Sequence, residues 1–247
     1  MDALAVRLPL AIEAIIFDFG QTLVDSADGF RSAEKAAERK LFADLALTDW
    51  EEFLANFRRV RTSFYTHGNF SRLGVWQEVY WHYCRDADET RLQQWETEYW
   101  QQVKDATTAF PEALPVLQEL AGQYTLAVIT NTEARTRTAP HRVHAFRELA
   151  QFFGTIVISG GDDIPPKPDL KAFTACLDEI DLAPASCVYV GDDWRMDVCG
   201  ARDAGLQPIW LKHESVKRNW PDIDAGDVPV ITNLNALLDL PALLANN

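Results

Sequence analysis

Four separate segments of this chain carry side chains that can act together on a phosphate group. Asp18 and Thr130 each follow an apolar run, Lys167 stands between two prolines, and Asp192 follows a third apolar run that ends in glycine. These residue types support attack by a carboxylate on phosphorus. Because both partners in that attack are negatively charged, a lysine and a divalent cation are needed to neutralise them.

The ends of strands are where such side chains are expected to meet. Short apolar runs are typical of buried strands, and the carboxyl ends of parallel strands form the edge at which open α/β sheets bind ligands. Each position also has an ordinary structural explanation. Asp192 and Asp193 can cap a helix that begins near Met196, and Thr ends many strands. The order and spacing of the whole set favour the functional interpretation.

The ordered set resembles the motifs of the haloacid dehalogenase superfamily of hydrolases, and the resemblance spans nearly the whole chain. Those motifs are an Asp-x-Asp-x-Thr-like nucleophile loop, a strand-terminal Thr or Ser, a Lys, and a Gly-Asp-x-x-x-x-Asp loop. The resemblance implies that Asp18 forms an aspartyl-phosphate. It also implies that the Thr130 hydroxyl, the Asn131 backbone amide and the Lys167 ammonium bind the phosphoryl group.

The same resemblance implies an Mg²⁺ site. Its protein ligands are expected to be one oxygen of Asp18, the backbone carbonyl of Gly20 and the carboxylate of Asp192, with water and a phosphate oxygen completing the octahedron. Asp197, or alternatively Asp193, is expected to orient the waters of the metal from outside its coordination shell.

Gly20 departs from the family motif. The phosphatases of the superfamily carry an acid at this position, which protonates the leaving group and later activates water. Loss of a general acid–base commonly costs about two to four orders of magnitude in rate. Three interpretations stay open: an enzyme that is slow or that acts on esters whose leaving group needs little protonation, a substitute group from the cap or Asp25, or a binding protein.

Hydrolysis of small phosphorylated metabolites is the first functional hypothesis, and a catalytically weak protein that binds phosphometabolites or a partner is the alternative. Halide displacement is disfavoured, because the dehalogenases of the superfamily lack the acidic loop that Asp192 and Asp197 provide here. Phosphonate cleavage requires a lysine of the cap that forms a Schiff base, for which Lys35 and Lys40 are the candidates.

Strands and helices alternate after residue 108, which predicts an α/β fold with a Rossmann-like, three-layer core around a parallel sheet. The predicted strands are 12–19, 125–130, 155–159, 187–190 and 207–211, with a short one at 228–232. The predicted helices of the core are 111–121, 141–151, 171–179, 197–204 and 234–244.

The stretch between the first strand and the first core helix has a different residue pattern, with aromatic and aliphatic side chains at helical spacing. It predicts an inserted helical domain at 28–107 and a discontinuous core domain of 1–27 and 108–247. In the resembled family, a helical cap at this place closes over the active site and selects the substrate.

Composition narrows the partners and the compartment. The 247 residues carry a formal net charge of −14, which argues against nucleic acid as a partner. The four cysteines show no metal-binding spacing, and neither a secretory signal nor an apolar run of about 20 residues is visible. We therefore expect a soluble cytoplasmic protein with a small phosphorylated substrate and no membrane association. No pattern in the sequence indicates an oligomeric state.

Overall fold

The apolar run before Asp18 forms the central strand of the sheet. This strand, β1 (Ala14–Phe17), is fully buried and pairs in parallel with β4 (Thr125–Asn131) on one side and β6 (Cys187–Gly191) on the other. A strand that is paired on both edges and covered on both faces accommodates only apolar side chains. The computed structural model describes residues 11–66, 69–131, 141–161 and 163–245.

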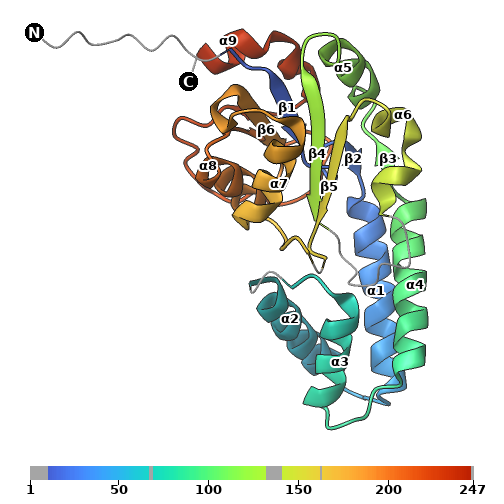
Figure 1. Ribbon diagram of the computed structural model, residues 1–247. Coiled ribbons are helices and arrows are strands. Elements are labelled where there is room, and N and C mark those ends of the chain that lie inside the picture. The colour runs from blue at the N-terminus through green and yellow to red at the C-terminus, as the bar shows by residue number, and fades with distance from the viewer. Residues whose placement is uncertain (1–10, 67–68, 132–140, 162, 246–247) are drawn as a thin grey trace, which may run out of the picture.

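The sheet has six strands in the order β5-β4-β1-β6-β7-β8, and all of its ladders are parallel (Figure 1). Its outer strands are β5 (Thr155–Ser159), β7 (Gln207–Leu211) and β8 (Val230–Ile231). The chain moves outward from β1 on one side and then returns to continue on the other. The carboxyl ends of the strands therefore share one edge, with a reversal of strand order next to β1, where such sheets bind ligands.

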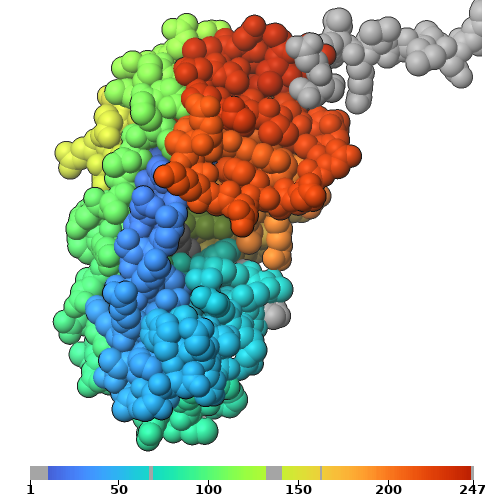
Figure 2. Space-filling model, turned by 180° about the vertical axis from the view of Figure 1, so that it is seen from behind, coloured from blue at the N-terminus to red at the C-terminus, as the bar shows by residue number. Residues whose placement is uncertain are grey.

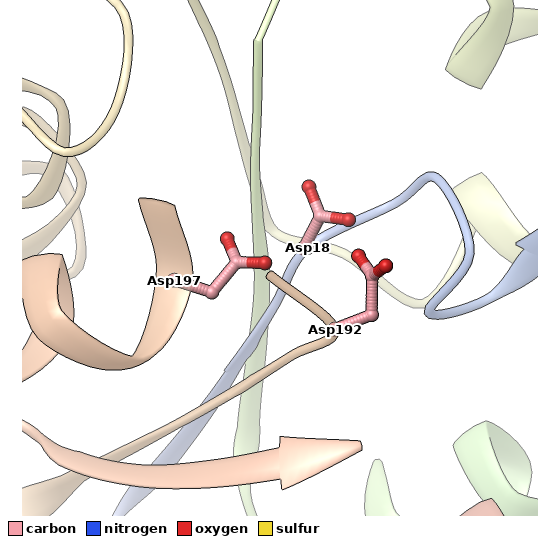
Figure 3. A group of neighbouring side chains, drawn as sticks. All are labelled: Asp18, Asp192 and Asp197. Carbon is pink, nitrogen blue, oxygen red and sulfur yellow. The ribbon is translucent and has the colours of Figure 1, made fainter. Parts of the chain in front are cut away.

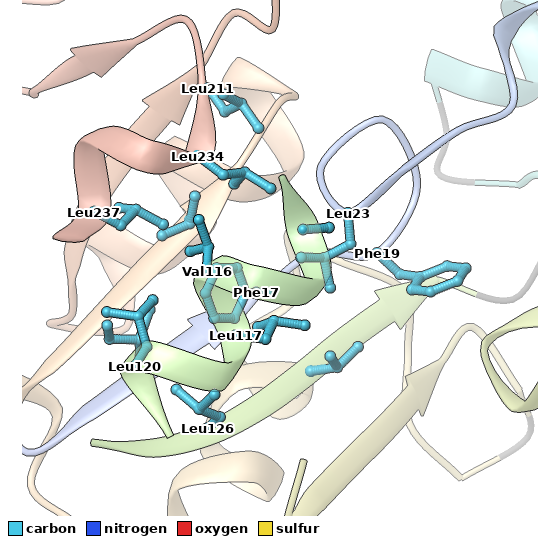
Figure 4. Packing of buried hydrophobic residues seen from close by; sticks show 14 of the residues in the cluster. Phe17, Phe19, Leu23, Val116, Leu117, Leu120, Leu126, Leu211, Leu234 and Leu237 are labelled. Carbon is cyan, nitrogen blue, oxygen red and sulfur yellow. The ribbon is translucent and has the colours of Figure 1, made fainter. Parts of the chain in front are cut away.

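Helices cover both faces of this sheet. Ile15 and Phe17 of β1 point into one apolar cluster, and Ala14 and Ile16 point into another, as alternation along a strand requires. The first face is covered by α5 (Ala113–Leu120), η1 (Arg142–Ala145), α6 (Arg147–Ala150), η4 (Leu234–Asp239) and α9 (Leu240–Ala245). Figure 4 shows the side chains of α5 and η4 packed in this cluster. The second is covered by α7 (Leu170–Ile180) and α8 (Gly200–Asp203). The predicted fold class is confirmed.

Four helices inserted between β2 and β3 form a unit with an apolar cluster of its own. They are α1 (Ala27–Asp44), α2 (Trp50–Thr66), α3 (Arg72–His82) and α4 (Glu89–Asp105). The helices α1 and α4 lead away from the core side by side, and α2 and α3 lie beyond the carboxyl ends of the strands (Figure 1). Figure 2 shows a hollow between the orange and red segments of the core and the blue and cyan helices.

A two-stranded antiparallel ribbon joins the two parts of the chain. It consists of β2 (Val24–Asp25) and β3 (Thr108–Ala109), where the chain leaves and re-enters the core. The sequence did not predict this ribbon, because strands of two residues have no measurable periodicity.

Three predicted helices of the core differ from the structure. The helix 141–151 is broken at Phe146, whose φ of −98° and ψ of 64° are not helical. The helix 197–204 begins earlier, because Asp193 caps a π-helical turn, η3 (Trp194–Cys199), that precedes α8. The helix 234–244 is a 3₁₀ segment followed by α9. Pro241 lies in the first turn of α9, where its missing N–H is not needed.

Among the helices of the described ranges, none combines the length and the apolar character that crossing a lipid bilayer requires.

Candidate functional site

Lys167 lies at the centre of a buried polar cluster below the carboxyl end of β1. Its side chain is only 2% exposed, so its ammonium group depends on protein oxygens. Nζ lies 2.8 Å from Oδ1 of Asp18, 2.7 Å from Oδ1 of Asp197 and 2.7 Å from the hydroxyl of Tyr189. It also donates to the backbone carbonyl of Ile129 at 2.9 Å. A buried ammonium group held by this many oxygens is fixed in position.

Asn131 holds the backbone that carries this lysine. Its Oδ1 accepts hydrogen bonds from the backbone N–H of Lys167 at 2.8 Å and from Oγ of Ser159 at 2.7 Å. The sequence predicts a role in phosphate binding for the backbone amide of Asn131, and the structure adds these contacts of its side chain. The sequence did not predict this bridge, and its one available signal was a polar side chain at the end of a strand, facing the loop after the next strand. The residues that directly follow Asn131 lie outside the described ranges.

Three carboxylates converge next to Lys167. One oxygen each of Asp18, Asp192 and Asp197 lies within 4.8 Å of the others, and Figure 3 shows the three side chains pointing toward one another. Gly191 permits this approach, because a Cβ atom there would lie 2.4 Å from the Asp197 side chain. The other oxygen of Asp197 accepts from the backbone N–H of Asp193 at 2.9 Å.

The electrostatics of this cluster are dominated by burial. Loss of solvation raises the pKa of Asp18 to about 6, because it outweighs the lowering effect of Lys167, and the Asp197 carboxylate adds to the rise. Burial likewise raises the pKa of Asp192 well above its ordinary value, although Arg218 opposes this. Burial disfavours the charged form of Lys167, yet Asp18 and Asp197 together raise its pKa. The cluster thus holds excess negative charge that a bound cation would relieve.

Arg218 is a member of the site that the sequence did not reveal. Its Nη1 lies 2.5 Å from Oδ2 of Asp192, and its Nη2 donates to the Asp192 carbonyl at 2.8 Å. That carbonyl also accepts from Nε1 of Trp210 at 3.0 Å, and the Arg218 guanidinium lies 4.0 Å from the centre of the Trp220 ring. Arg218 comes from the loop between β7 and β8, which has no motif. The sequence offered one indication of its role: Arg218 follows a strand, β7, whose carboxyl end lies at the same edge of the sheet as the site.

The remaining predicted residues lie around this centre. Thr130 is buried at the end of β4, and Gly20 lies two residues after Asp18 in the loop whose Thr22 hydroxyl donates to Oδ2 of Asp18 at 3.3 Å. Asp193 is turned away from the cluster, because its carboxylate caps η3 by accepting from the N–H groups of Arg195 and Met196. Of the two candidates for orienting a metal's waters, only Asp197 lies in the cluster.

Asp25, the candidate substitute for the missing acid, and Lys35 and Lys40, the candidates for a Schiff base, lie elsewhere. Asp25 accepts a hydrogen bond from the backbone N–H of Ala27 at 2.9 Å, at the start of α1. Lys40 forms an ion pair with Glu98 on the outside of the helical unit, and Lys35 is exposed. The contacts of Asp25 and Lys40 are thus with the helical unit and not with the carboxylate cluster.

The donor set fits a hard divalent cation such as Mg²⁺. Three carboxylates face one another, while Lys167 and Arg218 supply only two positive charges among the described side chains of the cluster. Both oxygens of Asp197 accept short hydrogen bonds, at 2.7 and 2.9 Å, whereas Oδ2 of Asp18 accepts a longer one of 3.3 Å from Thr22. Asp18 and Asp192 are therefore the carboxylates that better suit direct coordination. Oxygen ligands and few protein carboxylates are what Mg²⁺ prefers.

Comparisons with known proteins all find hydrolases similar to this chain. A model of the family described as haloacid dehalogenase-like hydrolase matches residues 12–205. The N-acylneuraminate-9-phosphatase of Rattus norvegicus is 24% identical over 247 residues, covering 94% of each protein. The phosphoserine phosphatase of Thermus thermophilus is 36% identical over 93 residues, covering 36% of each. A solved 2-haloacid dehalogenase from Pseudomonas syringae superposes with a TM-score of 0.63 at 26% identity, covering 95% of this chain and 99% of that chain. These matches confirm the resemblance that the motifs indicated.

Proposed function

Because the chain belongs to the haloacid dehalogenase-like hydrolase family, we propose that it hydrolyses phosphomonoesters of small metabolites, with Asp18 as the nucleophile. The observation that carries this proposal is the 2.8 Å contact between Oδ1 of Asp18 and the buried ammonium group of Lys167. A carboxylate fixed by a buried cation at the ligand-binding edge of a parallel sheet suits attack on an anionic centre. The phosphatase names of two relatives support the same reaction class.

The reaction proceeds in two steps on the residues of this chain. An oxygen of Asp18 attacks phosphorus and forms an aspartyl-phosphate, and water then hydrolyses this intermediate. Lys167 keeps Asp18 oriented and offsets the charge that accumulates when the phosphoryl group approaches. The Thr130 hydroxyl, at the neighbouring strand end, binds a phosphoryl oxygen.

Mg²⁺, when bound, supplies electrostatic stabilisation of the transferring phosphoryl group. Asp18, Asp192 and the backbone carbonyl of Gly20 would hold it, and Asp197 would orient its waters. The helical unit, residues 28–107, acts as a cap that covers the site, and residues 1–27 and 108–247 form the core. The hollow between the two parts in Figure 2 is consistent with access for a small phosphorylated substrate.

Hydrolysis of p-nitrophenyl phosphate tests this function, since its leaving group departs without protonation. We expect turnover that requires Mg²⁺ and disappears in Asp18→Asn. The matched control Asp178→Asn, which changes an exposed carboxylate on α7, should keep the wild-type rate. Chloride release from a chloroacid without added metal, together with no phosphate release from any aryl phosphate, would identify a dehalogenase and reject the proposal.

Arg218→Gln is expected to strengthen Mg²⁺ binding. The positive charge of Arg218 lies next to Asp192 and repels a cation bound there. Removing this charge should lower the dissociation constant of Mg²⁺ by about tenfold or more. Quenching of tryptophan fluorescence during a Mg²⁺ titration measures the affinity, because Trp210 and Trp220 adjoin these two residues. Lys217→Gln, at the exposed neighbouring position, should bind Mg²⁺ like the wild type. Unchanged or weaker affinity in Arg218→Gln would mean that Asp192 is not a ligand.

A further inference from the structure

A second arginine occupies the space that a side chain at position 20 would fill. A Cβ atom built on Gly20 would lie 2.6 Å from Nη2 of Arg142, far inside contact distance. The φ angle of Gly20 is not in the left-handed region, unlike those of Gly160, Gly205 and Gly226. The backbone therefore tolerates any residue at position 20. A Cβ atom there would instead displace this guanidinium from its place beside the nucleophile loop.

The segment that carries Arg142 is anchored to the nucleophile loop. The ring of Phe19, next to Asp18, packs edge-on against His141 and Phe146, and Val143 is buried in the core below. The Arg142 guanidinium lies 5.9 Å from the Phe19 ring centre. Arg142 is thus held beside the loop by packing on both sides, instead of reaching it from a distant surface.

The same guanidinium also contacts the start of the helical unit. Its Nη1 donates to Oγ of Ser26 at 3.0 Å, where the chain leaves the core. It lies 5.1 Å from the ring centre of Phe30 on α1. Arg142 therefore lies between the nucleophile loop and the helices that cover it.

This is the side on which a leaving group must depart. In phosphoryl transfer the attacking and leaving oxygens lie roughly in line, on opposite sides of phosphorus. Lys167 bonds Oδ1 of Asp18 and is itself bonded to Tyr189 and the Ile129 carbonyl, which lie within strands of the sheet, so the sheet side of Asp18 is filled. The oxygen opposite Asp18 is consequently directed away from the sheet, toward the helical unit.

We propose that Arg142 binds the leaving oxygen, and that the substrates are phosphoryl donors whose leaving group is stable as an anion: acyl, enol and aryl phosphates or phosphoanhydrides. This inference rests on the proposed function. A guanidinium stays protonated at all accessible pH values, so it stabilises the departing anion by charged hydrogen bonds and gives up no proton. The bond between phosphorus and the leaving oxygen breaks with its electron pair on that oxygen, while Asp18 forms the new bond to phosphorus. The anion takes a proton from water after it has left.

The dependence of kcat/KM on the pKa of the leaving group tests this directly. This constant reports phosphoryl transfer to Asp18, whatever the rate of the second step. We compare acetyl phosphate, a series of substituted phenyl phosphates, and glycerol phosphate. The wild type should show a steep fall toward poor leaving groups. Arg142→Ala should lose about 10²–10³-fold on the poorest substrates and little on acetyl phosphate, with partial recovery by added guanidinium ion.

Gly20→Ala supplies an independent perturbation. The clash is with the end of a flexible side chain, so the guanidinium moves while the fold is retained. Gly20→Ala should therefore show the same leaving-group-dependent loss as Arg142→Ala, and the double variant should lose no more than Arg142→Ala alone. Arg147→Ala changes an exposed arginine on the following helix and should match the wild type.

Several results would overturn the inference. They are a wild type that cleaves glycerol phosphate as fast as phenyl phosphate, a uniform loss across all substrates in Arg142→Ala, or additive losses in the double variant. Each leaves hydrolysis through Asp18 intact and rejects only the role of Arg142. Failure of every phosphoryl donor, with no label on Asp18, rejects the proposed function and this inference together.

Discussion

Lys167→Met is expected to lower the free energy of unfolding by about 3–5 kcal/mol, because it leaves buried carboxylates without their cation. Asp18 and Asp197 both bond to this ammonium group, and methionine keeps the unbranched side chain as far as Cε but lacks the ammonium group. Urea denaturation at neutral pH measures the loss. Phosphoryl transfer should be abolished in the same variant, since the nucleophile loses the group that holds it.

Two variants show whether the charge causes this loss. Lys171→Met removes an exposed lysine at the start of α7 and should change the free energy of unfolding very little. Adding Asp18→Asn to Lys167→Met should recover part of the stability, because one of the uncompensated charges disappears. An unchanged urea midpoint in Lys167→Met would show that the buried ion pairs do not exist in solution.

Asp18→Asn is expected to abolish hydrolysis and at the same time to stabilise the fold. Burial raises the pKa of Asp18 from 3.8 to about 6, so the charged carboxylate at neutral pH costs up to about 3 kcal/mol. Asparagine is similar in shape to the protonated acid and keeps an oxygen for Lys167. Removal of a catalytic group commonly increases stability for this reason.

The pH dependence of this gain follows from the direction of the pKa shift. Below about pH 4, Asp18 is protonated in both the folded and unfolded states, and the two proteins should be equally stable. As the pH rises from 4 to 6, the unfolded state loses its proton more readily, so the wild type loses stability relative to Asp18→Asn. Above about pH 6 the difference should be constant. Thermal unfolding of both proteins from pH 4 to 8, without metal, measures this difference, and a gap that narrows with rising pH would contradict the account.

The sequence was informative about this site because the chemistry lies at the ends of strands. Asp18, Thr130 and Asp192 each follow an apolar run that is visible as a strand, and parallel strands bring their carboxyl ends to one edge. The sheet and its order of elements follow from the same runs. Lys167 was recognisable only by its order among them.

The residues that the sequence missed come from loops and short elements. Arg218 comes from a loop and Arg142 from a short 3₁₀ segment, and their contacts depend on side-chain directions that no spacing encodes. The choice between Asp193 and Asp197 was left open for a related reason. It depends on whether a carboxylate caps its own helix or turns to Lys167, which only the three-dimensional arrangement determines.

The nucleophilic role of Asp18 is tested most directly by trapping the intermediate. The protein is mixed with acetyl phosphate and Mg²⁺, quenched in acid within the first turnover, digested and analysed by mass spectrometry. We predict one added phosphoryl group on the peptide that contains Asp18, and none on that peptide in Asp18→Asn. Release of phosphate without any label on this peptide, or a label on a different residue, would contradict the account.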